Sequence, residues 1–319
     1  MADKFNDKTT AEEAAALFAN DIKGKTVLVT GCTWGGLGAE AARVIAKHGA
    51  GIVILAGRKQ DALDDTISKI KEETPGAKLR SLIIDLASLE SVRGAAKEVN
   101  DYSEPIDVLI NNAAIMASPY NTTVDGFEAQ FGVNHLGPFL FTNLILPQIL
   151  ASKTGAPRIV NVSSLGHTLS PIRFTDYGFN GGKDYDKWQA YGQSKTANML
   201  FARELSNRYK GKGLTAFSLH PGVIRTNLER HVDVNVDPPA VLDTDGKTQK
   251  VEDFKWKTIP QGSATHIVAA FDPSIKDQSG SYLADAQLNN AGALPYALDD
   301  ANARKLWALS EQLIGQKFD

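Results

Sequence analysis

The sequence predicts an α/β fold built on one doubly wound parallel sheet of about seven strands, with helices on both faces. Short apolar runs rich in Val, Ile and Leu alternate with segments of helical periodicity. A glycine-rich turn, Gly31–Gly38, links the first of these runs to a helix. We find no internal repeat, so we expect one domain over residues 1–319. Such a sheet is of the Rossmann type, which binds ligands at the carboxyl ends of its strands.

Composition and charge argue against several classes of protein. Lys and Arg total 34 against 37 Asp and Glu, and no long block of one sign occurs, so we expect no nucleic-acid binding. The single cysteine, Cys32, excludes an internal disulfide, and Met1–Lys4 lacks the apolar region of a signal peptide. The longest apolar stretch, Phe139–Leu150, is too short to span a bilayer. We therefore expect a soluble, cytoplasmic protein with no membrane span.

The first elements of the chain point to a phosphate site. Thr10–Glu13 matches a capping box, which predicts a short helix over residues 9–20. Thr26–Thr30 is a β-prone run that ends at the glycine turn, and a helix begins near Leu37. In a strand, turn and helix of this kind, the backbone can approach a pyrophosphate and the helix N-terminus supplies N–H donors. We expect the turn to bind phosphate; a tight turn without a ligand is the alternative.

The second strand, Ile52–Ala56, completes a βαβ unit and is followed by Arg58 and Lys59. A carboxylate at this strand end would bind the ribose hydroxyls of NAD, whereas an arginine can pair with the 2′-phosphate of NADP. Because Arg58 stands there and no acid does, we expect NADP(H) as the cofactor. The alternative is an exposed surface arginine without a ligand.

The rest of the chain continues the alternation of strands and helices. Further strands are predicted at Leu79–Ile84, Ile106–Ile110, Arg158–Val162, Thr215–Leu219 and Ser281–Ala284. The last helix is predicted at Asp300–Leu313. Residues 229–260 have few aliphatic side chains and a Pro-Pro pair, so we expect either a mobile surface loop or a lid over the substrate site.

Tyr191 and Lys195 lie four positions apart in a predicted helix, Tyr191–Arg208, so a phenol and an ammonium group share one helix face. A free tyrosine titrates near ~10 and a neighbouring cation favours the phenolate, so the sequence predicts a phenol pKa shifted toward neutral pH. Such a pair can act as an acid or a base. On its own this spacing more often marks a solvated helix face, and the other motifs overturn that interpretation.

The order of the motifs resembles the short-chain dehydrogenase/reductase family, in its Tyr-x-x-x-Lys branch, over residues 24–226. Asn111–Ala114 is similar to the family's Asn-Asn-Ala-Gly, with alanine in place of the last glycine. The residues around the motifs look most like those of the retinol-dehydrogenase-like group and related fungal reductases. The glycine turn holds one residue more than the family pattern, which leaves open whether Gly35 or Gly36 is the second motif glycine.

The resemblance implies roles for individual residues. The implied catalytic residues are Asn134, Ser164, Tyr191 and Lys195. Tyr191 would exchange a proton with a carbonyl oxygen, and Ser164 would donate a hydrogen bond to that oxygen. Lys195 would lower the tyrosine pKa and hold the ribose, and Asn134 would position a water. The implied cofactor-binding residues are Gly31, Thr33, Gly35, Gly36, Leu37, Gly38, Arg58, Lys59, Asp85, Leu86, Asn112, Ala113, Tyr191, Lys195, Pro221, Gly222, Val223 and Thr226.

These inferences together predict an NADPH-dependent oxidoreductase that reduces a ketone, or oxidises a secondary alcohol, on a lipophilic aromatic or polycyclic substrate. The aromatic residues expected either to line its pocket or to serve as ordinary packing are Phe174, Tyr177, Phe179, Trp188, Phe254 and Trp256. No two histidines stand at ligand spacing, so no metal site is expected. A homodimer or homotetramer is compatible with the sequence. The alternative function is a non-catalytic NADPH-sensing regulator or scaffold of the same fold, which would not need the catalytic set.

Overall fold

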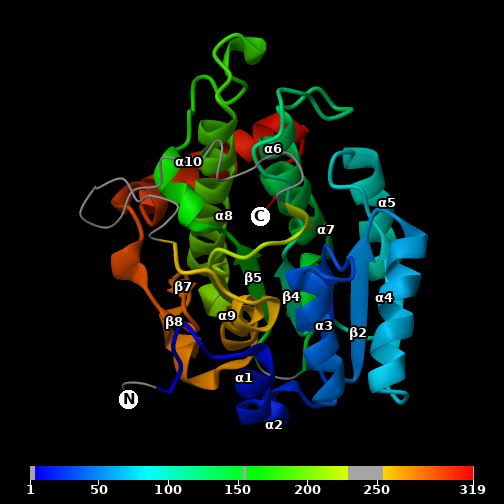
Figure 1. The fold of residues 1–319 in the computed structure, drawn as a ribbon. Helices are drawn as coiled ribbons and strands as arrows, with labels where there is room; N and C mark the ends of the chain where they lie inside the picture. Colours follow the sequence, from blue (N-terminus) through cyan, green and yellow to red (C-terminus); the bar gives the residue numbers. More distant parts are fainter. Residues whose placement is uncertain (1–3, 154–155, 229–253, 319) are drawn as a thin grey trace.

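The structure is a computed structural model that describes residues 4–153, 156–228 and 254–318 (Figure 1). One sheet runs through it in the strand order β3-β2-β1-β4-β5-β6-β7-β8, and only the β7–β8 pair is antiparallel. The strands are β1 Thr26–Thr30, β2 Ile52–Gly57, β3 Leu79–Ile83, β4 Val108–Asn111, β5 Arg158–Val162, β6 Thr215–His220, β7 Tyr282–Ala284 and β8 Gln287–Leu288. The predicted α/β fold with a doubly wound, mostly parallel sheet is confirmed.

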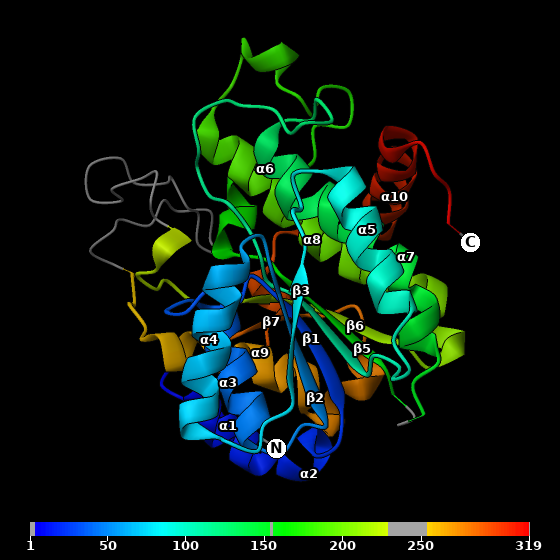
Figure 2. The ribbon, with the colours of Figure 1, turned by 90° about the vertical axis from the view of Figure 1, so that its right-hand side faces the viewer.

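Two hydrophobic cores lie on the two faces of this sheet. Figure 2 shows the sheet from its edge, with helices on both sides. Along β1, Val27 and Val29 belong to one core and Leu28 to the other, because successive side chains of a strand point to opposite faces. The first face is covered by α3 Leu37–Lys47, α4 Gln60–Glu73 and α9 Ile259–Phe271, with α1 Ala11–Leu17 outside them. The second face is covered by α5 Leu89–Asn100, α7 Gly137–Leu150 and α8 Lys187–Tyr209, with α10 Asp300–Ile314 against α8.

The α9 helix connects its strands with an unusual hand. The connections β4-α7-β5, β5-α8-β6 and β6-α9-β7 all step in the same direction across the sheet. α7 and α8 lie on one face, whereas α9 lies on the other beside α3. The α9 crossover therefore has the opposite hand to the two before it, although parallel connections almost always share one hand. This exception places α9 next to the glycine turn.

The N-terminal helix forms as its capping box predicts, but it is interrupted. The Thr10 hydroxyl accepts a hydrogen bond from the Glu13 amide at 3.3 Å, and the Glu13 carboxylate accepts one from the Thr10 amide at 2.8 Å. The predicted helix over residues 9–20 breaks at Phe18, whose backbone is not helical (φ −104°, ψ 18°). A second short helix, α2 Ala19–Ile22, follows.

Several boundaries differ from the sequence-based ones. α8 begins at Lys187, four residues before the predicted start, because the Asp186 carboxylate caps the amides of Trp188 and Gln189. The fourth strand begins at Val108 and not at Ile106. β8 was not predicted, because it has only two residues and pairs through a tight turn after β7.

The remaining elements connect the layers. A short helix, α6 Ala129–Phe131, runs into a π-helical turn, η1 Gly132–Leu136, before α7. The short 3₁₀ turns are η2 Leu165–Leu169, η3 Asn180–Gly182, η4 Lys210–Lys212, η7 Pro273–Gln278, η8 Asn290–Gly292 and η9 Pro295–Ala297. Of the loop or lid predicted over 229–260, residues 229–253 lie outside the described residues. Among the helices that the structure describes, none is long and apolar enough to cross a membrane.

Candidate active site

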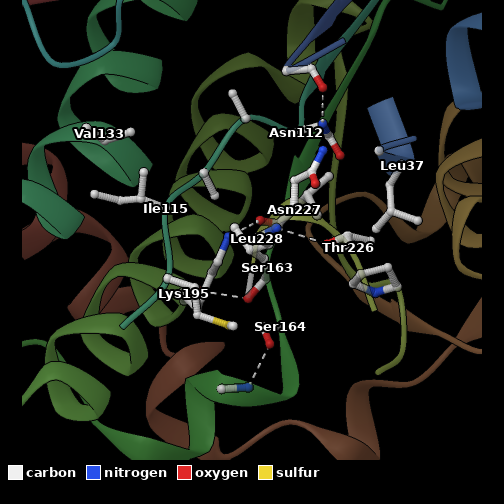
Figure 3. Close-up of a pocket in the computed structure, with 18 of the residues that line it drawn as sticks. Leu37, Asn112, Ile115, Val133, Ser163, Ser164, Lys195, Thr226, Asn227 and Leu228 are labelled. Carbon is white, nitrogen blue, oxygen red and sulfur yellow. Dashed lines mark hydrogen bonds between the residues drawn. The ribbon is translucent and has the colours of Figure 1, made fainter. Parts of the chain in front are cut away.

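A cavity of about 530 Å³ opens at the carboxyl ends of β1 to β6 (Figure 3). Most residues that the sequence assigned to a site line it. They are Gly31, Thr33, Gly36, Leu37, Arg58, Asp85, Leu86, Asn112, Ala113, Ser164, Tyr191, Lys195, Pro221, Gly222, Val223 and Thr226. Four others do not reach its wall: Gly35, Gly38, Lys59 and Asn134.

Two positions of the glycine turn need glycine for different reasons. Gly31 has φ +76°, and a Cβ there would lie 2.8 Å from the Ala113 Cα, so a side chain is excluded by both conformation and space. Gly36 lines the cavity and is the N-cap of α3, where no side chain accepts a hydrogen bond from the helix amides. Gly35 has φ +80° and lies outside the cavity lining. Of the two glycines in the lengthened turn, Gly36 therefore faces the cavity and Gly35 does not.

The tryptophan of this turn, Trp34, does not line the cavity. Trp34 is 37% exposed, and the Lys69 ammonium lies 5.3 Å from its ring centroid. It is not among the residues that line the cavity. A large residue at this position is therefore accommodated on the surface, where it does not obstruct the ligand side of the turn.

The ends of β1 and β4 are tied together beneath the cavity. The Thr30 hydroxyl accepts hydrogen bonds from the amides of Asn112 and Ala113, each at 3.0 Å. The Asn112 side-chain amide donates to the Thr30 carbonyl at 2.8 Å, and its oxygen accepts from His266 of α9 at 3.2 Å. A Cβ at Gly38 would lie 2.5 Å from the Asn112 amide nitrogen. The absence of a side chain at Gly38 thus allows α3 to approach this strand end. Gly38 itself does not line the cavity.

Arg58 and Asp85 lie at the ends of β2 and β3. Arg58 is exposed and lines the cavity, whereas the neighbouring Lys59 is exposed outside its lining. Asp85 is fixed at the cavity wall, because its carboxylate accepts a hydrogen bond from the Ala87 amide at 3.0 Å. The structure therefore places one cation and one anion at this end of the cavity.

Tyr191 and Lys195 lie on the first turns of α8, and both are buried at the cavity wall. The Lys195 ammonium lies 5.6 Å from the centroid of the Tyr191 ring. It donates a hydrogen bond to the Val162 carbonyl at the end of β5, at 3.0 Å. Figure 3 shows the Lys195 side chain reaching toward Ser163 and the strand ends.

Burial dominates the electrostatics of this pair. It raises the pKa of Tyr191 to about 12, and the hydrogen bond with Ser164 only partly offsets this. Burial also lowers the pKa of Lys195 to about 7. The sequence predicted the opposite direction for the phenol, because it treated the lysine as a fully charged neighbour. With its pKa near neutral, Lys195 carries only part of a positive charge at pH 7, so its effect on Tyr191 is weak.

Ser164 follows β5 and faces Tyr191. Both side chains line the cavity beside Gly166, and the Ser164 hydroxyl acts to lower the pKa of Tyr191. The Ser164 hydroxyl also accepts from the Gly166 amide at 3.0 Å and so caps the turn η2. A Cβ at Gly166 would lie 2.7 Å from the Tyr191 ring, so this turn packs directly on the phenol.

Asn134 lies in the π-helical turn, behind the cavity wall. Its side-chain oxygen accepts from the Ile115 amide at 2.8 Å, and its amide nitrogen donates to the Ile115 carbonyl and the Ser194 hydroxyl, each at 2.9 Å. It therefore anchors the loop after β4 to α8. The described hydrogen bonds of Asn134 do not include Lys195.

The segment after β6 is held from below by the chain that precedes α9. Val223 forms an isolated parallel bridge with Trp256, and its carbonyl accepts from the Lys257 amide at 2.9 Å. A Cβ at Gly222, which has φ +105°, would lie 2.6 Å from the Lys257 side chain. Lys257 in turn forms an ion pair with Asp285 in the β7–β8 turn.

Only two of the six aromatic residues proposed for the pocket line the cavity, namely Trp188 and Phe254. Phe179 is fully buried and packs on Tyr185, and Tyr177 packs on Phe131. Phe174 packs against the core, and the ring of Trp256 lies under Arg225. These four therefore do not line the cavity: Phe174, Tyr177 and Phe179 follow the packing alternative, and Trp256 is 37% exposed.

Most of the chain matches one known protein family. The family model described as short chain dehydrogenase matches residues 25–237. The chain belongs to the short-chain dehydrogenase family. This family membership makes it an oxidoreductase, as the sequence predicted. The match covers the glycine turn, the strand ends and the Tyr191–Lys195 pair.

Individual relatives agree with this assignment. Retinol dehydrogenase 13 of Mus musculus is 41% identical over 299 residues, which cover 92% of this chain and 85% of the relative. The chloroplastic short-chain dehydrogenase TIC 32 A of Brassica napus is 37% identical over 316 residues, 97% of this chain and 94% of the relative. The chain thus has retinol-dehydrogenase-like relatives, as predicted.

Solved structures show the same fold. An uncharacterised protein from Mycobacterium paratuberculosis is 33% identical with a TM-score of 0.71, over 94% of this chain and 98% of that one. A protein described as an NAD(P)-dependent gluconate 5-dehydrogenase from Beutenbergia cavernae, with bound NADP, is 25% identical with a TM-score of 0.62. That match covers 85% of this chain and 98% of the other.

Other cavity residues were missed by the sequence reasoning. The apolar ones are Ile84, Ile115, Met116, Val133, Val162, Leu165, Leu169, Ile224 and Leu228. The others are Thr30, Ala56, Gly57, Ala114, Ser163, Gly166, His220 and Asn227. Most of them directly neighbour a motif residue, so extending each motif by one or two positions would have found them. Val133 precedes Asn134 and would be found in this way, whereas nothing in the sequence marks Leu169, which reaches the wall through η2.

The buried charge of Lys195 generates a stability prediction. Because the folded pKa is about 7 and the ordinary value is 10.5, the unfolded chain holds a proton that the folded chain lacks between these pH values. Wild-type stability should therefore rise with pH in this window. Lys195→Met removes the buried cation and should stabilise the ligand-free protein by about 2 to 4 kcal/mol at pH 6 to 7, a gain that shrinks toward pH 10.

Urea unfolding at pH 6, 7.5 and 9 measures this effect. The exposed Lys59→Met serves as the control and should match the wild type at each pH. An equal pH dependence in Lys195→Met and wild type would show that Lys195 is hydrated and fully charged in the folded protein.

Proposed function

We propose that this protein is an NADPH-dependent reductase of ketones on lipophilic, aromatic or polycyclic molecules, which oxidises the secondary alcohol in the reverse direction. One observation carries the proposal: the hydroxyl-bearing side chains of Tyr191 and Ser164 lie together, beside Gly166, at the wall of a cavity that Lys195 also lines. Two hydroxyl donors that converge on one point can bind a single carbonyl oxygen. A non-catalytic NADPH sensor would not need this arrangement.

The cavity fits a phosphorylated dinucleotide at its other end. The close approach of Gly31 to Ala113 leaves no room for a side chain at Gly31, and the amides that open α3 at Gly36 have no side-chain cap. Arg58 supplies a cation for a 2′-phosphate, and Asp85 supplies an acceptor for the base. NADP(H), when bound, supplies or accepts the hydride. We retain the cofactor-binding residues proposed from the sequence. Among them, Gly35, Gly38 and Lys59 would support the site without lining the cavity.

The roles of the chain's own residues follow from their environment. With a pKa of about 12, the Tyr191 hydroxyl keeps its proton at neutral pH and can donate it to a developing alkoxide. Ser164 donates a hydrogen bond to the same oxygen and holds it in place. Lys195, whose pKa lies near 7, can gain or lose a proton at physiological pH beside the phenol. Asn134 acts through the Ile115 loop, which it anchors.

The substrate end of the cavity supports the lipophilic class. Trp188 stands edge-on to Tyr191, with ring centroids 6.4 Å apart, and Phe254 lies in the opposing segment before α9. The other walls near the catalytic residues are apolar: Ile115, Met116, Val133, Leu165, Leu169 and Leu228. Apolar walls with few polar groups favour burial of hydrocarbon rings.

Location and assembly complete the proposal. We propose a cytoplasmic protein that forms a homodimer or homotetramer, with one domain over residues 1–319. Cell fractionation tests the first point, since one of the relatives is named as chloroplastic. Gel filtration with light scattering tests the second.

Tyr191→Phe tests the proposed chemistry. Removal of the proton donor should lower turnover of an aryl ketone about 10² to 10⁴-fold, while NADPH binding changes little, because the ring that lines the cavity is kept. Turnover is followed by NADPH absorbance. Tyr177→Phe is the matched control, since this tyrosine lies outside the cavity lining, and it should keep wild-type turnover. Wild-type rates in Tyr191→Phe would refute the role of this phenol.

Arg58→Ala tests the cofactor preference. Loss of a charge-assisted contact of about 1.5 to 3 kcal/mol should weaken NADPH binding roughly tenfold to a hundredfold, while NADH binding stays unchanged. Fluorescence titration of both cofactors measures this difference. Lys59→Ala is the comparison variant and should lose less, since Lys59 does not line the cavity. Equal affinity of the wild type for NADPH and NADH would contradict the preference.

The substrate class predicts a preference for large rings. kcat/KM for a naphthalene- or anthracene-sized ketone should exceed that for a short aliphatic ketone by an order of magnitude or more, at ~25 cal/mol per Å2 of buried apolar surface. Trp188→Ala should reduce this ratio, whereas Trp256→Ala should not, because its ring lies outside the cavity lining. A preference for the aliphatic ketone or for a sugar would show that the substrate class is wrong.

A further inference from the structure

We propose that His167 and His220 are positioning residues that hold Ser164 in its reactive orientation by binding the two ends of one peptide group. The group is the peptide between Ser164 and Leu165, directly after the serine. His167 binds its carbonyl and His220 binds its N–H. The inference rests on the proposed function, in which the Ser164 hydroxyl must be aimed at a carbonyl oxygen.

The contacts of His167 determine its tautomer. Its Nδ1 lies 2.8 Å from the Ser164 carbonyl, which can only accept, so Nδ1 carries the proton. Its Nε2 accepts from the Leu294 amide at 3.2 Å, which requires a bare nitrogen. Burial lowers the pKa of His167, in agreement with a neutral ring. Both ring nitrogens are therefore used, and the ring is fixed between Ser164 and the C-terminal segment.

His220 holds the other end of the same peptide. Its Nδ1 accepts from the Leu165 amide at 3.0 Å, so this nitrogen is unprotonated. Burial, with the charge of Lys257, lowers the pKa of His220 to about 3, so the acceptor persists at neutral pH. His220 is the last residue of β6, and it lines the cavity.

The peptide between Ser164 and Leu165 lies where the chain turns into η2, so it controls the orientation of Ser164. Ser164 is the N-cap of η2, with an extended backbone (φ −164°, ψ 161°), so the orientation of the following peptide fixes where the chain leaves the serine. The residue before it is already anchored: the Ser163 amide donates to the Leu219 carbonyl at 2.7 Å, and its hydroxyl donates to the Lys195 carbonyl at 2.7 Å. The two imidazoles complete the restraint on the far side.

A matched pair of substitutions at His220 tests the proposal. An asparagine oxygen takes the place of Nδ1 as acceptor, whereas leucine fills similar space without one. His220→Leu should lower kcat for an aryl ketone about 10- to 100-fold with little change in the KM for NADPH, because a displaced catalytic group costs rate. His220→Asn should recover most of the loss. At His167, Asn can replace the Nδ1 donor, so His167→Asn should retain more activity than His167→Leu.

Two further measurements separate positioning from general damage. In a Ser164→Ala background, His220→Leu should cost almost nothing more, because its effect passes through the serine. Full, multiplicative loss in that background would overturn the proposal. Equal rates in His220→Leu and His220→Asn would overturn it too.

Hydrogen exchange at the Leu165 amide provides a readout independent of activity. Exchange should be slow in the wild type and in His220→Asn and at least tenfold faster in His220→Leu at unchanged melting temperature. Unchanged exchange in His220→Leu would refute the contact itself. If the wild type turns over no ketone but the exchange pattern holds, the proposed function fails and the peptide restraint stands.

Discussion

The close approach of two strand ends is the constraint on which the rest of the site depends. Where β1 and β4 end, the backbone of Gly31 lies so near Ala113 that one extra carbon would collide. Thr30 and Asn112 hold this contact with hydrogen bonds, and Gly38 lets α3 approach from above. The result is a cavity floor where, at Gly31, the backbone is exposed with no room for a side chain. The hydrogen-bonded sheet keeps these strand ends rigid, and the glycines leave space beside them.

The buried pair Tyr191 and Lys195 shows how such a site is maintained at a cost in stability. An ammonium group and a phenol are both removed from water on α8, and each becomes harder to ionise. The fold tolerates this because β5 offers the Val162 carbonyl to Lys195. Residues that would improve stability at these positions would remove the proposed chemistry, a conflict common in active sites.

The sequence predicted the parts of the fold that depend on local pattern. β1 and β5 begin and end at the predicted residues, since continuous β-branched runs bounded by polar turns leave little freedom. The motif residues likewise gather at one cavity, because parallel strands present their ends together. Properties set by tertiary packing were not predictable. Aromatic residues such as Phe179 look alike in sequence whether they face a ligand or a core, and a phenol pKa depends on burial that spacing does not reveal.

The place of α9 beside the glycine turn, which the unusual hand of its crossover produces, affects how the chain folds during synthesis. α9 is the wall of the glycine turn: Ser263 donates to the Leu37 carbonyl, His266 donates to Asn112, and Gly262 is small where Leu37 packs. A nascent chain that has emerged only as far as β6 includes Ser164, Tyr191 and Lys195 but lacks this wall. During synthesis, folding from the N-terminus would therefore leave the glycine turn uncovered until α9 has also emerged, when about the last sixth of the chain has yet to leave the ribosome. Translation products truncated before α9 should accordingly expose this turn to solvent.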